Sequence, residues 1–175
     1  NLYDPAVYFL NSGYQQTETI YDLQDYFTYP VNVYCGGFNG SNPAVYVRID
    51  KNALDSYNTA NGTDYIMLPD DCFSFEGGEK KLSDKKASYD IVFDCAKLVQ
   101  LCSEDGFSAL SKYVVPLTVA SLSGEVNTGR VNLTETFISP VMDKMGFKVN
   151  YSGDREMSIS EMEEDNDFIY VKYKV

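Results

Sequence analysis

Histidine is absent from the 175 residues of this sequence, and its absence excludes several kinds of active site. Without an imidazole the chain cannot build a Ser-His-Asp or Cys-His nucleophilic site, because histidine is the general base there. The histidine ligands of HExxH zinc sites and of two-histidine iron sites are missing as well. What remains offers little for specific catalysis, so we expect no enzymatic activity of this chain and no cofactor.

Positive charge is also scarce, with 14 Lys and Arg against 26 Asp and Glu and a formal net charge of −12. Nucleic acid is therefore excluded as a partner, because a protein that binds a polyphosphate must bring a basic surface to it. No stretch approaches the roughly 18 consecutive apolar residues of a membrane-spanning helix. The sequence has no tryptophan but has 15 tyrosines, and tyrosine favours strands and half-exposed faces.

Alternation of apolar and polar residues with a period of two dominates the chain and predicts strands with one buried face. It is clearest on the two sides of the turn-rich segment 36–43. The flanking segments predict a β-hairpin, with Val33 opposite Val47 and Tyr34 opposite Tyr46, because this register puts both apolar sets on one face.

Many further short strands separated by turn signals are typical of a β-sandwich. They are expected at residues 6–10, 19–23, 72–76, 88–95 and 113–122, with helical turns at 51–60 and 96–101. Pro116 cannot donate a ladder hydrogen bond, so its strand should have an edge or a bulge there. We predict an all-β, antiparallel sandwich with one or two short helical turns. Its expected core residues are Val33, Val47, Ile49, Phe75, Ile91, Phe93, Leu117 and Val119.

The alternation stops near Pro140, which suggests a domain boundary. Residues 1–135 are expected to form the sandwich module, and residues 136–175 a C-terminal extension. Fewer than about 40 residues rarely form a stable core alone. The extension should therefore either pack on the sandwich or begin a truncated second domain, with strands at 147–151 and 167–175.

Four segments resemble a known family in their order and spacing: residues 45–50 (VYVRID), 54–58 (LDSYN), 62–69 (GTDYIMLP) and 113–120 (YVVPLTVA). They are similar to the domain of unknown function 1735, the N-terminal module of many Bacteroidetes surface lipoproteins. The resemblance implies an immunoglobulin-like β-sandwich and export to the bacterial outer-membrane surface or periplasm, with a lipid anchor on a cysteine upstream of Asn1. It also implies a setting of glycan capture and breakdown, and it carries over no catalytic residue.

The four cysteines, Cys35, Cys72, Cys95 and Cys102, include no CxxC pair, so a zinc site is not expected. In an exported protein they allow three disulfide pairings. If residues 96–101 are helical, Cys95 and Cys102 lie about 10 Å apart along the axis, which is beyond disulfide reach. Since Cys35 and Cys95 fall on apolar faces, we expect buried, unpaired thiols.

Carboxylates are numerous, and two of them about 5 to 10 Å apart would be enough for a glycosidase. No acidic residue stands in a context that separates it from solvated surface charge, so none is assigned as catalytic. One acidic run offers the oxygen ligands that calcium prefers: Glu161, Glu163, Glu164, Asp165 and Asp167. It lacks the central glycine of an EF-hand loop, so we expect a solvated loop and no metal site.

The predicted hairpin turns four side chains away from the core, and these are the candidate ligand-binding residues: Asn32, Tyr34, Tyr46 and Arg48. Two tyrosine rings beside an amide and a guanidinium could form a small sugar platform, with the rings against the apolar face of a pyranose. Cross-strand tyrosine pairs also stabilise sheets without binding anything. This structural role is the favoured interpretation.

The leading functional hypothesis is a non-catalytic module of a cell-surface glycan-handling lipoprotein, which either binds carbohydrate or acts as a spacer. One alternative is a structural or adhesion subunit, which contacts other surface proteins through its acidic surface and exposed strand edges. Another is an accessory domain of a glycoside hydrolase. The expected partners are therefore glycan or other surface proteins, and the membrane is reached only through the lipid anchor.

Overall fold

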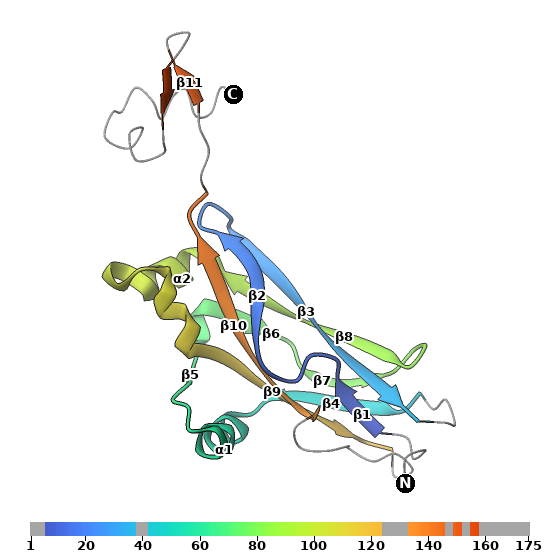
Figure 1. Cartoon of the computed structure of the whole chain (residues 1–175). Helices are drawn as coiled ribbons and strands as arrows, with labels where there is room; N and C mark the ends of the chain where they lie inside the picture. Colours follow the sequence, from blue (N-terminus) through green and yellow to red (C-terminus); the bar gives the residue numbers. More distant parts are fainter. Residues whose placement is uncertain (1–5, 38–41, 124–132, 146–148, 152–154, 158–175) are drawn as a thin grey trace. The chain divides into compact units, whose positions relative to one another are not determined.

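The computed structural model describes residues 6–37, 42–123, 133–145, 149–151 and 155–157 (Figure 1). The chain divides into two compact units, Asn1–Asp143 and Lys144–Val175. The first unit is an all-β sandwich with two short α-helices, as the alternating pattern predicted. Within the described residues, no helix is both long enough and apolar enough to cross a membrane.

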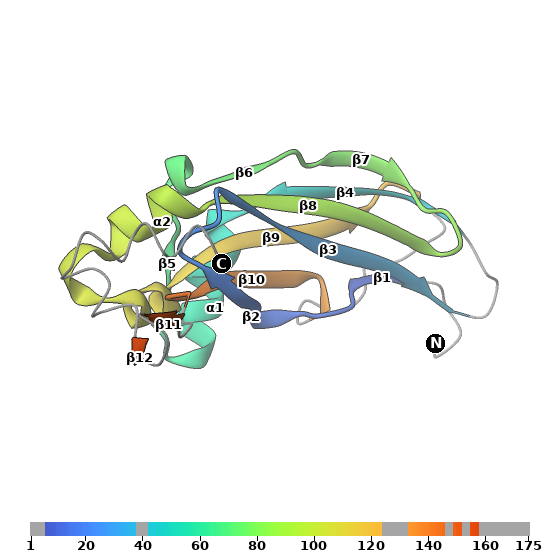
Figure 2. The same cartoon turned by 90° about the horizontal axis from the view of Figure 1, so that it is seen from above.

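One layer of the sandwich, which we call sheet A, has four antiparallel strands in the order β1-β3-β8-β6. They are β1 (Ala6–Phe9), β3 (Tyr26–Gly36), β8 (Lys86–Asp94) and β6 (Phe73–Phe75). The long strands β3 and β8 lie side by side in both views (Figures 1 and 2) and pair from Tyr26 opposite Asp94 to Tyr34 opposite Lys86.

The other layer, sheet B, has the order β2-β10-β9-β4-β7, with β5 beside β9. Its strands are β2 (Gly13–Tyr21), β10 (Glu135–Asp143), β9 (Tyr113–Ser121), β4 (Ala44–Ile49), β7 (Gly78–Lys81) and β5 (Ile66–Met67). The prediction of antiparallel pairing holds except that β2 pairs parallel to β10 and β5 parallel to β9. The sheet is therefore mixed, because the chain crosses from β1 in sheet A to β2 at the edge of sheet B.

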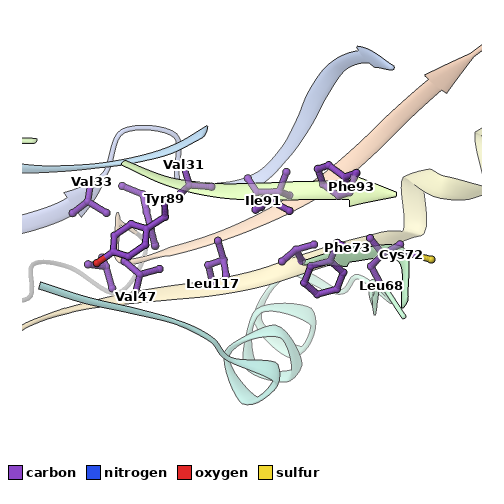
Figure 3. Close-up of a cluster of buried hydrophobic side chains, with 14 of the residues drawn as sticks. Val31, Val33, Val47, Leu68, Cys72, Phe73, Tyr89, Ile91, Phe93 and Leu117 are labelled. Carbon is purple, nitrogen blue, oxygen red and sulfur yellow. The ribbon is translucent and has the colours of Figure 1, made fainter. Parts of the chain in front are cut away.

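Strands β3 and β4 do not form the predicted hairpin, because they belong to different sheets. Val33 lies opposite Ala87 in sheet A, and Val47 lies opposite Val119 in sheet B. Both valines are buried, but they reach the core from opposite layers (Figure 3). Alternation indicates which face of a strand is buried, but it does not identify the strand beside it. The predicted pairing of β3 with β4 was therefore wrong, although the predicted burial of Val33 and Val47 was right.

The hydrophobic core lies between the two sheets. Figure 3 shows side chains of β3 and β8, such as Val31 and Ile91, facing Val47 and Leu117 from β4 and β9. Six predicted core residues are buried: Val33, Val47, Ile91, Phe93, Leu117 and Val119. Phe75 is only partly buried against the core. Ile49 is 36% exposed and does not belong to the core, because it is the last residue of β4 before the chain turns into a helix.

The sandwich does not end before Pro140, because strand β10 runs through it with a break in its register beside the proline. A bulge accommodates the missing N–H of a proline within a strand. There the N–H of Val141 donates to Oγ1 of Thr17 at 3.0 Å. The strands of the sandwich therefore extend to Asp143, beyond the predicted range 1–135.

Pro116 also lies within a sheet, since β9 has β10 on one side and β4 on the other. Its carbonyl accepts a hydrogen bond from the N–H of Asp50 at 3.0 Å, just past the last residue of β4. The nitrogen and carbonyl of one strand residue point to the same side. The proline thus needs no donor, because the pairing with β4 ends there.

The predicted helical turns are present and capped. Oδ1 of Asp50 accepts from the N–H of Ala53 at 3.1 Å at the start of α1, and Gly62 ends α1 with φ of 63° in the left-handed region that glycine adopts easily. Oδ1 of Asp94 accepts from the N–H of Lys97 at 3.2 Å at the start of α2. The helices are α1 (Lys51–Asn61) and α2 (Cys95–Cys102), with 3-10 helices η1 (Asp70–Cys72), η2 (Ser103–Asp105) and η3 (Phe107–Lys112).

Among the described residues of the second unit, β11 (Val149–Tyr151) pairs antiparallel with β12 (Arg155–Met157). Strand β11 lies within the strand predicted at 147–151. The strand predicted at 167–175 and the acidic run from Glu161 lie outside the described residues.

Candidate functional site

The four candidate ligand-binding residues from the sequence do not share a face. Asn32 and Tyr34 lie on the outer face of sheet A, and Tyr46 and Arg48 lie on the outer face of sheet B. The valine between the members of each pair points into the core, so its neighbours point away from the core on opposite sides of the sandwich. A joint sugar platform of these four residues is therefore not formed.

On sheet A, both candidate side chains contact neighbouring strands. Asn32 Oδ1 accepts a hydrogen bond from Ser88 Oγ at 2.5 Å. The ring of Tyr34 stacks on that of Tyr8 with centroids 6.2 Å apart, and Nζ of Lys86 lies 5.8 Å from the Tyr34 ring centroid. These are cross-strand contacts of the kind that stabilise sheets.

On sheet B, Arg48 belongs to a network around Asp50. Nη2 of Arg48 lies 2.9 Å from Oδ2 of Asp50, and Thr118 Oγ1 donates to the same oxygen at 3.3 Å. Because the other Asp50 oxygen caps α1, this one carboxylate ties the helix to β4 and β9. Tyr46 is 43% exposed.

Helix α1 packs on the outer face of sheet B. Figure 3 shows it, in teal, on the side of β9 away from the core. Leu54 of the helix contacts Val114 of β9 and Phe137 of β10 in a second apolar group, which we call the outer cluster. The outer cluster holds α1 at a fixed place on this face.

Tyrosine rings surround the outer cluster and are held by one another. The rings of Tyr14 and Tyr65 stack with centroids 4.4 Å apart and planes 4° apart, and the ring of Tyr57 lies 4.5 Å from that of Phe137. The Asn58 amide donates to the Tyr65 carbonyl at 2.9 Å and accepts from the Tyr65 N–H at 3.1 Å. Such packing fixes the rings before any ligand arrives.

Beside the outer cluster lies a hollow of about 560 Å³, which we call the α1–β10 hollow. That volume is within the ~300–1,000 Å³ typical of small-ligand sites. The described residues that line it are Gly13, Ser56, Tyr57, Ala60, Asn61, Glu135 and Phe137. Gly13 has φ of +74°, and a Cβ there would lie 3.9 Å from the Tyr57 hydroxyl. Glycine thus allows this backbone conformation and keeps that wall open.

Glu135 lines the α1–β10 hollow, and one oxygen of its carboxyl group lacks a hydrogen-bond partner among the described residues. That oxygen, Oε2, is buried. Burial raises the pKa of Glu135, and the negative charge of Asp50 raises it further. A buried polar atom without a partner lowers the stability of the folded protein.

The lining combines apolar surface with hydrogen-bonding groups. Tyr57 and Phe137 supply rings, and Ser56, Asn61 and Glu135 supply a hydroxyl, an amide and a carboxyl group. This combination suits a small ligand that has both apolar and polar faces. Only one acid is among the described lining residues, so they do not provide the carboxylate pair of a glycosidase.

The four cysteines, the other candidate reactive groups of the sequence, are buried. Burial raises the pKa of all four cysteine thiols, and with the Asp71 carboxylate it raises the pKa of Cys72 to about 12. These thiols are free and inaccessible, so they pack as small hydrophobes and cannot supply a thiolate readily. Within the described residues, no group of three or more Cys, Asp or Glu could hold a metal ion.

Sequence reasoning missed the α1–β10 hollow because its walls come from three distant segments. One signal was present, since Glu135 and Phe137 are two residues apart and must share a face if they lie in a strand. The predicted sandwich ends at residue 135, so Glu135 and Phe137 were not placed on one strand. Tyr57 and Asn61 are likewise four residues apart and share a face of α1.

Several solved structures from Bacteroides ovatus resemble this chain. A candidate carbohydrate-binding protein has a TM-score of 0.53 at 21% identity, over 83% of this chain and 40% of its own. A protein of unknown function has a TM-score of 0.57 at 17% identity, over 87% and 52%. A multidomain protein including DUF1735 has a TM-score of 0.53 at 15% identity, over 87% and 54%. These likenesses establish the fold, and the chain spans roughly half the length of these structures.

Comparison with curated protein sequences finds no match. A family model described as an N-terminal domain matches residues 3–126, which is more than half of the chain and most of the sandwich. The matched range includes helix α1 and all strands of the first unit except β10. This chain therefore belongs to that family of N-terminal domains.

Proposed function

We propose that this chain is a non-catalytic carbohydrate-binding module of a glycan-handling protein, with the α1–β10 hollow as its binding site. The observation that carries the proposal is the lining of the hollow, in which two fixed rings stand beside a hydroxyl, an amide and a carboxyl group. A sugar ring has apolar faces that pack on aromatic rings and hydroxyls that need polar partners. The hollow supplies both.

The comparisons support the wider setting of this proposal. One similar structure is a candidate carbohydrate-binding protein, and another is a multidomain protein including DUF1735. We propose that this chain is part of a surface lipoprotein, anchored through a cysteine upstream of Asn1. Because the chain spans roughly half the length of those structures, the module would work beside at least one further domain.

The proposal is tested by electrophoresis of the protein through gels that contain candidate polysaccharides. We expect weak retardation of the parent, with affinity in the high micromolar to millimolar range, or roughly −4 to −6 kcal/mol, as for other open sites. Ala60→Leu fills the hollow from an exposed helix position, and Tyr57→Ala removes one ring. Both changes should abolish retardation.

The matched control is Thr59→Leu, which adds a side chain of the same size one residue away, at an exposed position that does not line the hollow. It should migrate like the parent, and so should the double variant Tyr34→Ala, Tyr46→Ala. Loss of retardation only in the double variant would mean that Tyr34 and Tyr46 bind the glycan, as the sequence suggested, and that the hollow does not. Absence of retardation of the parent on every glycan would favour a spacer.

A further inference from the structure

We infer that Glu135 makes the α1–β10 hollow selective by charge, so that it takes neutral and amino sugars and excludes acidic ones. This inference rests on the proposed function, because it names the class of sugar that the same site accepts. The residue would determine specificity by direct contact with the ligand.

The hydrogen-bonding capacity of the Glu135 carboxylate supports this selectivity. An ionised carboxylate only accepts hydrogen bonds, and Oε2 of Glu135 has no donor among the described residues. A ligand group that contacts the Glu135 carboxylate in the hollow must therefore bring an O–H or N–H donor. Sugar hydroxyls and ammonium groups do so, whereas a carboxylate or sulfate group brings only acceptors and a like charge.

The charge around the α1–β10 hollow disfavours an acidic ligand. None of its described lining residues is basic. Asp50 is close enough to raise the pKa of Glu135 further, and the one arginine of this network, Arg48, is already paired with Asp50 at 2.9 Å. An acidic sugar would lose hydration of its charge without gaining a cation. The net charge of −12 adds repulsion at longer range.

The aromatic wall of the hollow also favours a positively charged ligand. Tyr57 and Phe137 line the hollow together with Glu135. The face of an aromatic ring is negative and attracts a cation such as an ammonium group. The rings and the carboxylate thus favour the same sign of ligand charge, and an amino sugar should bind most tightly.

The test uses nine methyl glycosides: those of glucose, galactose and mannose, each as the neutral sugar, the 2-amino-2-deoxy sugar and the uronate. Dissociation constants are measured by ligand-observed NMR at pH 7 and low salt. In at least one of the three series we expect the amino sugar to bind about tenfold more tightly than the uronate, a difference of about 1.4 kcal/mol, with the neutral sugar between them.

Three variants separate the role of Glu135 from general electrostatics. Glu135→Gln keeps the shape and removes the charge, so the ratio between amino sugar and uronate should fall to within about twofold. Glu135→Asp keeps the charge and should keep the order of the three sugars. Glu104→Gln removes the same charge from an exposed residue of η2 and should leave the ratio unchanged.

Several results would overturn the inference. They are a uronate that binds as tightly as the neutral sugar, a ratio unchanged in Glu135→Gln, or a parent that binds none of the nine glycosides. The last result does not decide the proposed function, because the gel experiment with Ala60→Leu tests that separately. Circular dichroism of Glu135→Gln checks folding, and if this variant fails to fold, loss of the sugar order in Glu135→Asp overturns the inference.

Discussion

The two faces of sheet B are covered to different degrees. On the inner face Val47, Leu117 and Ile138 are at most 1% exposed, because sheet A covers them along the length of the strands. On the outer face helix α1 and its neighbouring loop cover one part of the sheet, and η3 lies against β10, where Ser139 Oγ donates to the Leu110 carbonyl at 2.9 Å. Beside the outer cluster lies the hollow that Glu135 lines. A second sheet covers the whole face of the first, whereas a short helix covers only part of it. Next to α1 this leaves a hollow lined by polar and apolar groups, and ligands bind at such concave sites.

The largest expected effect is a truncation on the inner side. Phe93 is fully buried between the sheets, so Phe93→Ala should lower the free energy of unfolding by about 3–5 kcal/mol through lost burial and the cavity left behind. Urea denaturation followed by circular dichroism measures this. A loss below about 1 kcal/mol would show that the core can rearrange around the missing ring.

A smaller effect is expected from a truncation on the outer side. Leu54→Ala should cost about 2 kcal/mol, at the lower end for a buried leucine, because the outer cluster is small and lies beside the hollow. It should also weaken glycan retardation, since Leu54 holds the helix that carries Tyr57. The control is Val99→Ala on α2, where the side chain is 36% exposed and should cost less than about 0.5 kcal/mol. Equal losses for Leu54→Ala and Phe93→Ala would contradict the difference between the two faces.

The smallest expected effect is a pH-dependent change in thermal stability when the charge of Glu135 is removed. Burial, with the charge of Asp50, raises the pKa of Glu135 above its usual value of 4.5, so folding favours its protonated form. Its contribution to stability is full below pH 4.5 and is lost as pH rises through the raised pKa. Near pH 7 Glu135→Gln should therefore melt slightly above the parent, by about 2 °C or less, and this advantage should shrink toward pH 4.

Thermal melts of the parent and Glu135→Gln between pH 4 and pH 7 give this difference, because the titration of other carboxylates is common to both proteins. A variant that melts below the parent at pH 7 would mean that Oε2 has a partner in solution. A difference that does not change with pH would mean that Glu135 is not desolvated.

Local features of the chain were largely predictable. The alternation around Val33, Val47 and Ile91 correctly identified strands and their buried faces, because side chains alternate across a strand whatever its neighbour is. The helical turn predicted at 51–60 is present as α1, and its caps, Asp50 and Gly62, are residues close in sequence. Ile49 is the exception, since its exposure depends on where the strand ends.

The candidate site was not predictable in the same way. Tyr34 and Tyr46 were predicted to lie side by side, but they lie on opposite faces of the sandwich. The groups that do converge, Gly13, Tyr57 and Glu135, come from β2, α1 and β10. No short-range rule relates three such distant positions. The bulge beside Pro140 interrupts the alternation of β10, so the strand that carries Glu135 was not predicted.

The sequence by itself determined the β class, the buried face of most strands and the lack of histidine-based catalysis, because these depend on residue type and on spacing within a few positions. Only the tertiary structure decided that β3 and β4 face each other across the core and that α1 covers part of sheet B. The physical reason is that burial is non-directional. A valine gains as much free energy from either sheet, so the choice of partner belongs to the packing of the whole domain.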